Sequence, residues 1–111
     1  MLDFEQPFPL VEPAFLITIV SETILKESLI MLLTQLKVRS YTVSEVQGAG
    51  RQSRRSADPE ASQTTMIETN LEIKAIVSQE ISNVILYALK EQQRNFAVFV
   101  YRQPIEALIE D

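Results

Sequence analysis

The sequence predicts an α+β fold in which a strand–helix–strand unit occurs twice. The segments FLITIVSETI (15–24) and LEIKAIVSQEI (71–81) share one pattern: a run rich in β-branched residues, then Val-Ser, then acidic residues that open a helical pattern. After each helical pattern come an arginine and a further strand-like run, RSYTVSEV and RNFAVFVY. Two such units joined strand to strand predict the ferredoxin-like βαββαβ arrangement, with one four-stranded antiparallel sheet.

The composition predicts a single domain and excludes several kinds of chemistry. The chain has 111 residues, of which 46% are hydrophobic, and this is enough for one core. Ten Lys and Arg against fifteen Asp and Glu give a formal charge of -5, which disfavours general binding to nucleic acid. The chain has no cysteine and no histidine, so thiolate chemistry and the usual neutral-pH base are absent. We therefore expect a binding protein and not an enzyme.

The N-terminal residues 1–13 are expected to form an extended arm. They are acidic, contain prolines 7, 9 and 13, and lack the basic and apolar regions of a signal peptide. The longest apolar run, Leu29 to Leu33, is far below the roughly 20 residues that span a bilayer. These features predict a cytoplasmic protein with no direct membrane insertion.

The two helices are predicted from helical spacing and capping residues. Ser21 and Ser78 are suitable N-caps, and an acidic residue, Glu22 or Glu80, sits in each first turn. The first helix is expected from Glu22 to about Lys37. The residues predicted to face the core are Leu25, Leu29, Leu32 and Leu36 in the first helix, and Ile81, Val84, Ile85 and Leu89 in the second.

Two apolar surfaces are more extensive than a monomer is expected to expose. The strand FAVFVY is apolar on both faces although the topology places it at a sheet edge, and Ile30, Met31 and Leu33 broaden the apolar face of the first helix. In the tail, residues 103–111, three apolar residues have helical spacing, but the segment is too short to be a stable helix alone: Ile105, Leu108 and Ile109. We expect a homo-oligomer; alternatively, the tail folds back onto its own edge strand.

A long polar connection, Val46 to Thr65, joins the second and third predicted strands. Connections of this length are uncommon in compact domains and are usually functional or disordered. Two glycines in GAGRQ (48–52) permit a positive φ, so successive backbone N–H groups can converge on an anion. Arg51, Arg54 and Arg55 add planar groups suited to phosphate. A bare turn with solvated arginines is the alternative.

The segment TVSEVQGAGRQ, residues 42–52, closely resembles the stretch that enters the T-loop of PII signalling proteins. The resemblance extends in weaker form from about residue 14 to 101. It implies a ferredoxin-like domain over residues 14–102, with the T-loop at about 46–65, that assembles as a homotrimer. PII proteins bind adenine nucleotides in clefts between subunits and present their T-loops to a transporter, channel or enzyme.

The resemblance also implies roles for individual residues. Thr42 would lie beside the adenine, and Gly48, Ala49 and Gly50 would line the path to the phosphates. Arg51 matches an arginine that reaches the terminal phosphate. Gln52 matches a glutamine that helps to hold magnesium and 2-oxoglutarate.

Departures from the nitrogen-regulatory pattern favour a PII-like branch that includes regulators of bicarbonate transporters. The segment KEQQRNF (90–96) lacks the glycines and the lysine of the usual phosphate loop, and Asn70 replaces the lysine that pairs with 2-oxoglutarate. No tyrosine lies between Val43 and Ile76, which excludes uridylylation in the loop. Members of this branch respond to AMP, ADP, ATP or cyclic AMP, and Arg55 falls near an arginine that they use on the phosphates.

Three functions follow as alternatives. The first is a nucleotide-sensing adaptor that controls a membrane transporter or metabolic enzyme. The second is a slow nucleotide hydrolase in which Glu45 or Glu68 places a water. The third is a trimeric scaffold whose loop binds another ligand, such as bicarbonate or a metal ion. A role for magnesium stays open.

Overall fold

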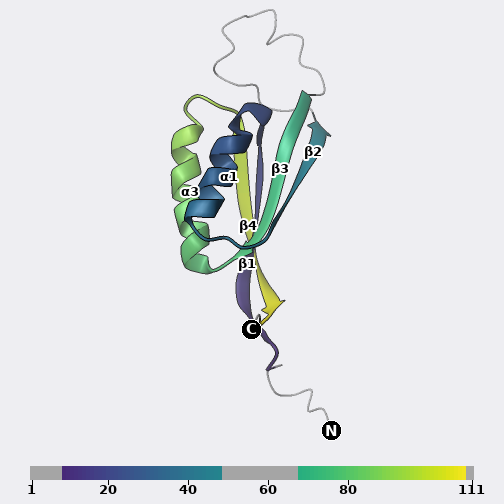
Figure 1. Cartoon of the computed structure of the whole chain (residues 1–111), viewed down its shortest axis with the longest axis vertical. Coiled ribbons are helices and arrows are strands. Elements are labelled where there is room, and N and C mark those ends of the chain that lie inside the picture. The colour runs from purple at the N-terminus through teal and green to yellow at the C-terminus, as the bar shows by residue number, and fades with distance from the viewer. Residues whose placement is uncertain (1–8, 49–67, 110–111) are drawn as a thin grey trace, which may run out of the picture.

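A computed structural model describes residues 9–48 and 68–109 of the chain (Figure 1). The sequence of elements confirms the predicted βαββαβ order within these residues. The elements are β1 (Val11–Glu22), a single 3₁₀ turn η1 (Thr23–Leu25), α1 (Lys26–Gln35), β2 (Tyr41–Gly48), β3 (Glu68–Val77), α3 (Gln79–Gln92) and β4 (Val98–Leu108).

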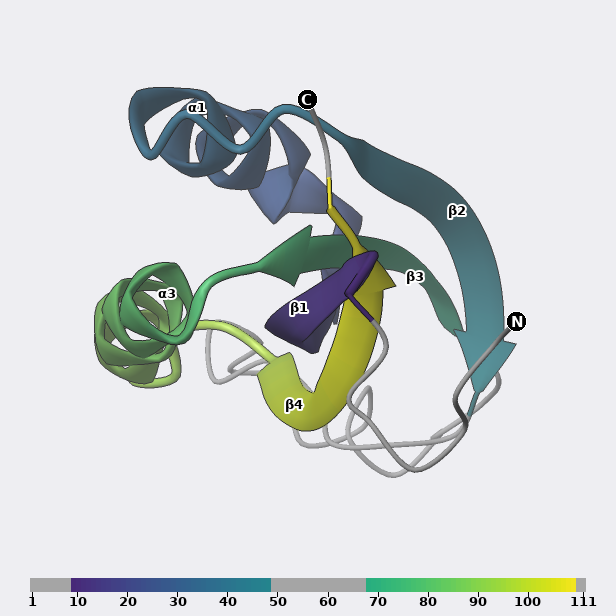
Figure 2. The ribbon, with the colours of Figure 1, turned by 90° about the horizontal axis from the view of Figure 1, so that it is seen from below.

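The four strands form one antiparallel sheet in the order β2-β3-β1-β4. Figure 2 shows α1 and α3 on one face of this sheet; within the described residues no helix covers the opposite face. We call this opposite face the open face. As predicted, β4 lies at an edge, and β2 forms the other edge.

The core lies between the sheet and the two helices. Alternate residues of the central strands face the helices and are fully buried, for example Ile17, Ile19 and Ile73. Of the two predicted apolar stripes, four residues are buried as expected: Leu25, Leu29, Ile85 and Leu89. Three other residues of these stripes are less buried than predicted: Leu32 and Leu36 are half-buried, and Val84 is 46% exposed. Leu33, in contrast, is fully buried. Leu29 and Leu33 are four residues apart within α1 and therefore lie on one face of the helix, and both are buried.

The two helix starts differ although their sequences are alike. The Ser78 side chain accepts a hydrogen bond from the Ile81 N–H at 3.2 Å, which confirms it as the N-cap of α3. The predicted cap at Ser21 is wrong: Ser21 lies inside β1 and is buried, and α1 begins only at Lys26. Glu22 is not in a helical turn, because its carboxylate accepts the Ala97 N–H at 2.6 Å and ties the end of β1 to the start of β4.

Helix α1 ends earlier than predicted, at Gln35, in a Schellman motif. The Val38 N–H donates to the Leu33 carbonyl at 2.9 Å, and the Lys37 N–H donates to the Thr34 carbonyl at 3.0 Å. Lys37 takes the left-handed position of this motif, with φ 61°, where glycine is usual.

The helical spacing of apolar residues in the tail does not correspond to a helix, because β4 continues as a strand to Leu108. Its pairing with β1 extends from Ser21↔Val98 to Val11↔Leu108, and the Ile109 N–H donates to the Leu10 carbonyl at 2.8 Å. Strand pairing satisfies backbone groups that a helix this short would leave open. The paired ends project from the body of the molecule (Figure 1).

Candidate functional site

Strand β2 carries two of the predicted site residues at its opposite ends. Thr42 is exposed near the start and pairs with Lys74, and Gly48 ends the strand opposite Glu68. They are six positions apart along the strand, which corresponds to about 20 Å. Gly48 is extended and does not adopt a positive φ, contrary to the freedom that we expected this glycine to use. The other predicted site residues lie outside the described residues: Ala49, Gly50, Arg51, Gln52 and Arg55.

Thr42 lines a groove of about 700 Å³ at the end of the sheet where β2 starts and β3 ends. Its walls come from residues 12–14 and 16 of β1, residues 36–42 from the end of α1 into β2, the end of β3 with the start of α3, and residues 107–108 of β4. Leu16, Leu36 and Ile76 provide apolar lining. This volume falls in the range of small-molecule sites. We call this hollow the Thr42 groove.

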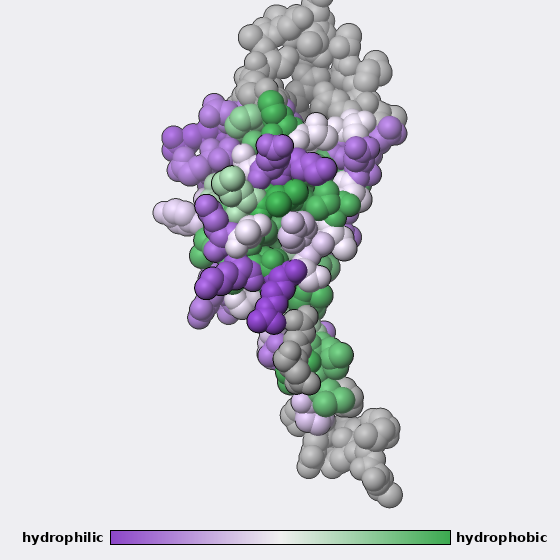
Figure 3. All heavy atoms as spheres, in the orientation of Figure 1, coloured by the Kyte–Doolittle hydropathy of each residue, from purple (hydrophilic) through white to green (hydrophobic). Residues whose placement is uncertain are grey.

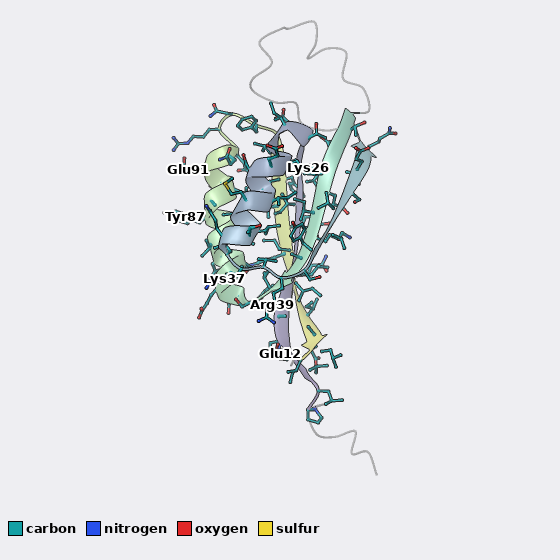
Figure 4. All side chains as sticks on the ribbon, in the orientation of Figure 1. Glu12, Lys26, Lys37, Arg39, Tyr87 and Glu91 are labelled. Carbon is teal, nitrogen blue, oxygen red and sulfur yellow. The ribbon has the colours of Figure 1, made fainter. Side chains whose placement is uncertain are left out.

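The Thr42 groove is positively charged although the chain as a whole is acidic. Lys37, Arg39 and Lys74 line it, and among residues 9–48 and 68–109 Glu12 is the one carboxylate that lines it. Figure 4 labels Lys37, Arg39 and Glu12 near the place where the body meets the projecting strands. Lys74 is also within 3.9 Å of Glu72, but both side chains are partly exposed, so this ion pair is weak.

The sequence analysis did not predict that these cationic residues line a groove. The segment Lys37-Val38-Arg39 between the first helix and the second strand was the available signal. No sequence pattern marks Lys74 as a groove residue, because its position opposite Thr42 depends on the register of β2 against β3.

At the upper end of the molecule, the ends of β1 and β2 lie beside the starts of β3 and β4 (Figure 1). In the turn after α3, where the resemblance to PII proteins led us to expect a phosphate loop, residues of the turn contact one another. The Phe96 N–H donates to the Gln92 carbonyl at 3.0 Å, and Arg94 lies 3.4 Å from Glu91 with most of its side chain exposed. These contacts stabilise the turn without any glycine.

The open face carries exposed apolar side chains. Ile76, Phe99 and Tyr101 are 56%, 60% and 38% exposed, and the Phe99 and Tyr101 ring centroids are 5.7 Å apart. On the other face of β4, Val98 is buried and Val100 is half-buried against the core. The prediction that FAVFVY is an edge strand with two apolar faces is therefore confirmed.

Two kinds of site are not found in the described parts of the chain. Residues 9–48 and 68–109 contain no group of three or more acidic side chains placed to hold a metal ion. In the same ranges, no helix is long and apolar enough to cross a membrane.

This two-layer βαββαβ domain, with a long connection from β2 to β3 and a ligand-sized groove beside β2, defines a PII-like signalling protein. The family model for nitrogen regulatory protein P-II matches residues 14–107, and the chain belongs to this family. A comparison with curated proteins finds no match.

Among solved structures, the chain is similar to proteins that are described as PII-like. TTHA0516 of Thermus thermophilus, described as PII-like, is 29% identical over 88% of this chain and 92% of its own, with a TM-score of 0.67. CPII of Thiomonas intermedia, a nitrogen regulatory PII-like protein solved with ADP, AMP and bicarbonate, is 20% identical (91% and 99% covered; TM-score 0.70). A DUF3240 family protein of Shewanella baltica shares the fold at 12% identity (83% and 89% covered; TM-score 0.62).

Proposed function

We propose that this protein senses an adenine nucleotide at clefts between subunits and controls a membrane transporter or a metabolic enzyme through its T-loop. The adenine lies in the Thr42 groove of one subunit, and Gly48, Arg51, Gln52 and Arg55 of a neighbouring subunit bind the phosphates, because Thr42 and Gly48 of one chain lie about 20 Å apart. AMP, ADP, ATP and cyclic AMP are the candidate ligands. The ADP and AMP bound by CPII support this class.

The observation that carries the proposal is the groove beside Thr42, on the strand that leads into the T-loop. The groove has a volume of about 700 Å³, and β2 continues from Thr42 to Gly48. A ligand in this groove therefore contacts the strand that leads to the loop that meets the partner. A tenfold shift between two loop states needs a difference in binding free energy of only about 1.4 kcal/mol.

We further propose that the protein acts as a homotrimer in the cytoplasm, at the membrane where its partner is a transporter. PII proteins are trimers, and the exposed apolar residues of the open face give this chain a surface to bury. A threefold arrangement would cover the open face of each subunit with its neighbours.

Binding, and not catalysis, is the proposed activity. PII proteins are generally signalling proteins without catalysis. Glu45, one of the two carboxylates considered for a hydrolase, is exposed in β2. We propose magnesium only as an ion that binds together with ATP. Titration with ATP in the presence and absence of magnesium tests this.

Titration calorimetry with ADP, GDP and adenosine tests the function. ADP should bind better than GDP, and Thr42→Val should weaken ADP binding by about 0.5 to 1.5 kcal/mol, the range for one hydrogen bond. Thr23→Val changes an exposed threonine outside the Thr42 groove and should leave ADP affinity unchanged. If no adenine nucleotide binds or raises the melting temperature, the nucleotide assignment is wrong.

A further inference from the structure

A second groove lies on the helix side of the sheet, between α3 and β4. Its volume is about 500 Å³, which is in the range of small-molecule sites. Leu86 and Leu89 of α3 and Val100 of β4 give it an apolar lining, whereas the outer side of α3 is mainly hydrophilic (Figure 3). Among the described residues, it shares no lining residue with the Thr42 groove. We call this hollow the α3–β4 groove.

Each end of the α3–β4 groove is bridged by a side-chain contact between the helix and the strand. At one end the Gln93 amide donates to the Val98 carbonyl at 3.1 Å. At the other end the Arg102 guanidinium donates to the Asn83 side-chain carbonyl at 2.6 Å. Val98, Val100 and Arg102 are alternate residues of β4 and therefore share the face toward α3. The two bridges fix the helix relative to the strand, so the groove is preformed.

The polar groups beside the apolar lining are hydrogen-bond donors. Because the Asn83 side-chain oxygen is bound by Arg102, the NH₂ group of this amide is left to donate. The Lys90 ammonium donates to the Gln93 side chain at 3.3 Å and keeps two further N–H groups. Tyr87, labelled on α3 in Figure 4, adds a hydroxyl group at the groove. These groups favour a ligand that carries hydrogen-bond acceptors.

The α3–β4 groove is also positively charged, although the chain as a whole is acidic. Lys90 lies at one end and Arg102 at the other, and within residues 9–48 and 68–109 neither forms an ion pair with a carboxylate. Glu91, the carboxylate next to Lys90 in the sequence, lies 3.4 Å from Arg94. In the described parts of the chain, no acidic residue lines the groove. An anionic group is therefore the complementary partner.

We propose that the α3–β4 groove binds a medium-chain carboxylate. The carboxylate accepts hydrogen bonds from the Lys90 ammonium, and the apolar chain lies over Leu86 and Val100 toward Asn83. A small anion alone would leave the apolar lining uncovered, and an uncharged apolar molecule would leave the ammonium group without a partner. Lys90 and Asn83 are seven positions apart on α3, which corresponds to about 10 Å and sets the length of the chain.

This site goes beyond the proposed function and does not depend on it. It lies on the helix side of the sheet, whereas the proposed trimer buries the open face. A trimer that buries the open face would therefore leave the α3–β4 groove accessible.

Amide ¹H–¹⁵N NMR spectra of the full chain, titrated with sodium octanoate, test the proposal. Octanoate should bind with a dissociation constant of about 1 to 10 mM, as expected for a ligand of this size. The signals of residues 83–93 and 98–102 should shift most. Acetate has no apolar chain and octylamine has no carboxylate, so both should cause much smaller shifts. No shifts with octanoate, or equal shifts with acetate or octylamine, would overturn the proposal.

Substitutions of Lys90 test the role of its charge. Lys90→Gln should weaken octanoate binding about tenfold, the low end of the range for a hydrogen bond to a charged group. Lys90→Arg keeps the charge and should retain binding. The matched control is Lys26→Gln, the same change at an exposed position of α1 outside the groove, and it should leave binding unchanged. Equal losses in Lys26→Gln and Lys90→Gln, with both variants folded by circular dichroism, would contradict the assignment.

The titration contains no nucleotide, so its result is separate from that of the proposed function. Octanoate binding without any ADP-induced rise in melting temperature would support the α3–β4 groove and reject nucleotide sensing. An ADP-induced rise without octanoate binding would reject the α3–β4 groove as a ligand site and leave nucleotide sensing standing.

Discussion

Lys37 combines an unfavourable backbone conformation with a position that lines the Thr42 groove. Its φ of 61° lets the chain leave α1 through a Schellman motif and start β2 four residues later. For a residue with a Cβ atom this conformation costs about 1–2 kcal/mol. The same position places an ammonium group on the Thr42 groove, which a glycine would not supply.

Lys37→Gly should therefore stabilise the fold by about 0.5 to 1 kcal/mol, the relief of strain minus the greater entropy of the unfolded chain. Lys37→Ala also removes the charge but keeps the Cβ atom, so it should give no gain. Urea unfolding of both variants at one protein concentration measures the difference. Equal stabilisation by both would point to charge and not to backbone strain.

The arginines of the T-loop provide a second prediction at this scale. Arg51→Ala or Arg55→Ala should each weaken ADP binding by about 1.5 to 3 kcal/mol, the range for hydrogen bonds to charged groups. Adenosine, which has no phosphate, should bind both variants like the parent. Arg54→Ala should change ADP affinity by less than about 0.5 kcal/mol. Calorimetry would contradict the assignment if Arg54→Ala caused the largest loss.

At the scale of the elements, the sequence predicted the order of strands and helices but not every boundary. The periodicity of apolar residues is a local signal, and it located both helices and all four strands. Ser21 and Ser78 stand in similar sequences, yet only Ser78 caps a helix. What differs is tertiary: the pairing of Ser21 with Val98 and the contact of Glu22 with Ala97 extend β1, and no local pattern contains these partners.

Ser78→Ala should lower the free energy of unfolding by about 1 kcal/mol, the usual value of an N-cap side chain. Its matched control is Ser28→Ala, an exposed serine within α1, where alanine is the better helix former and no loss is expected. Thermal unfolding of both variants at equal concentration would show the difference. A loss no larger for Ser78→Ala than for Ser28→Ala would mean that the cap contributes nothing.

At the scale of the whole molecule, the candidate site was predicted only in part. Thr42 and Gly48 came from the resemblance of one continuous segment. The Thr42 groove gathers Lys37, Lys74 and Glu12 from separate parts of the chain, so only the fold brings them together. Likewise, the helical spacing of the tail was misleading because its strand partner lies at the other end of the sequence.

The wild-type protein should sediment at about three times 12.6 kDa at micromolar concentration. Tyr101→Asp places a charge on the open face and should shift the protein toward the monomer, since burying an unpaired charge is costly. Tyr87→Asp replaces an aromatic residue of α3 that is 83% exposed, and this variant should remain trimeric. A monomeric wild type, or equal dissociation by both variants, would contradict burial of the open face between copies.

The position of β1 in the sheet has a consequence for synthesis of the chain. β1 lies between β3 and β4, so both of its partners, residues 68–77 and 98–108, leave the ribosome long after it. Pairings so distant in sequence form slowly. The apolar run Leu16–Val20 must therefore wait without a partner while α1, β2 and the T-loop are made, and nascent chains that end before residue 98 expose it along the edge that β4 later occupies.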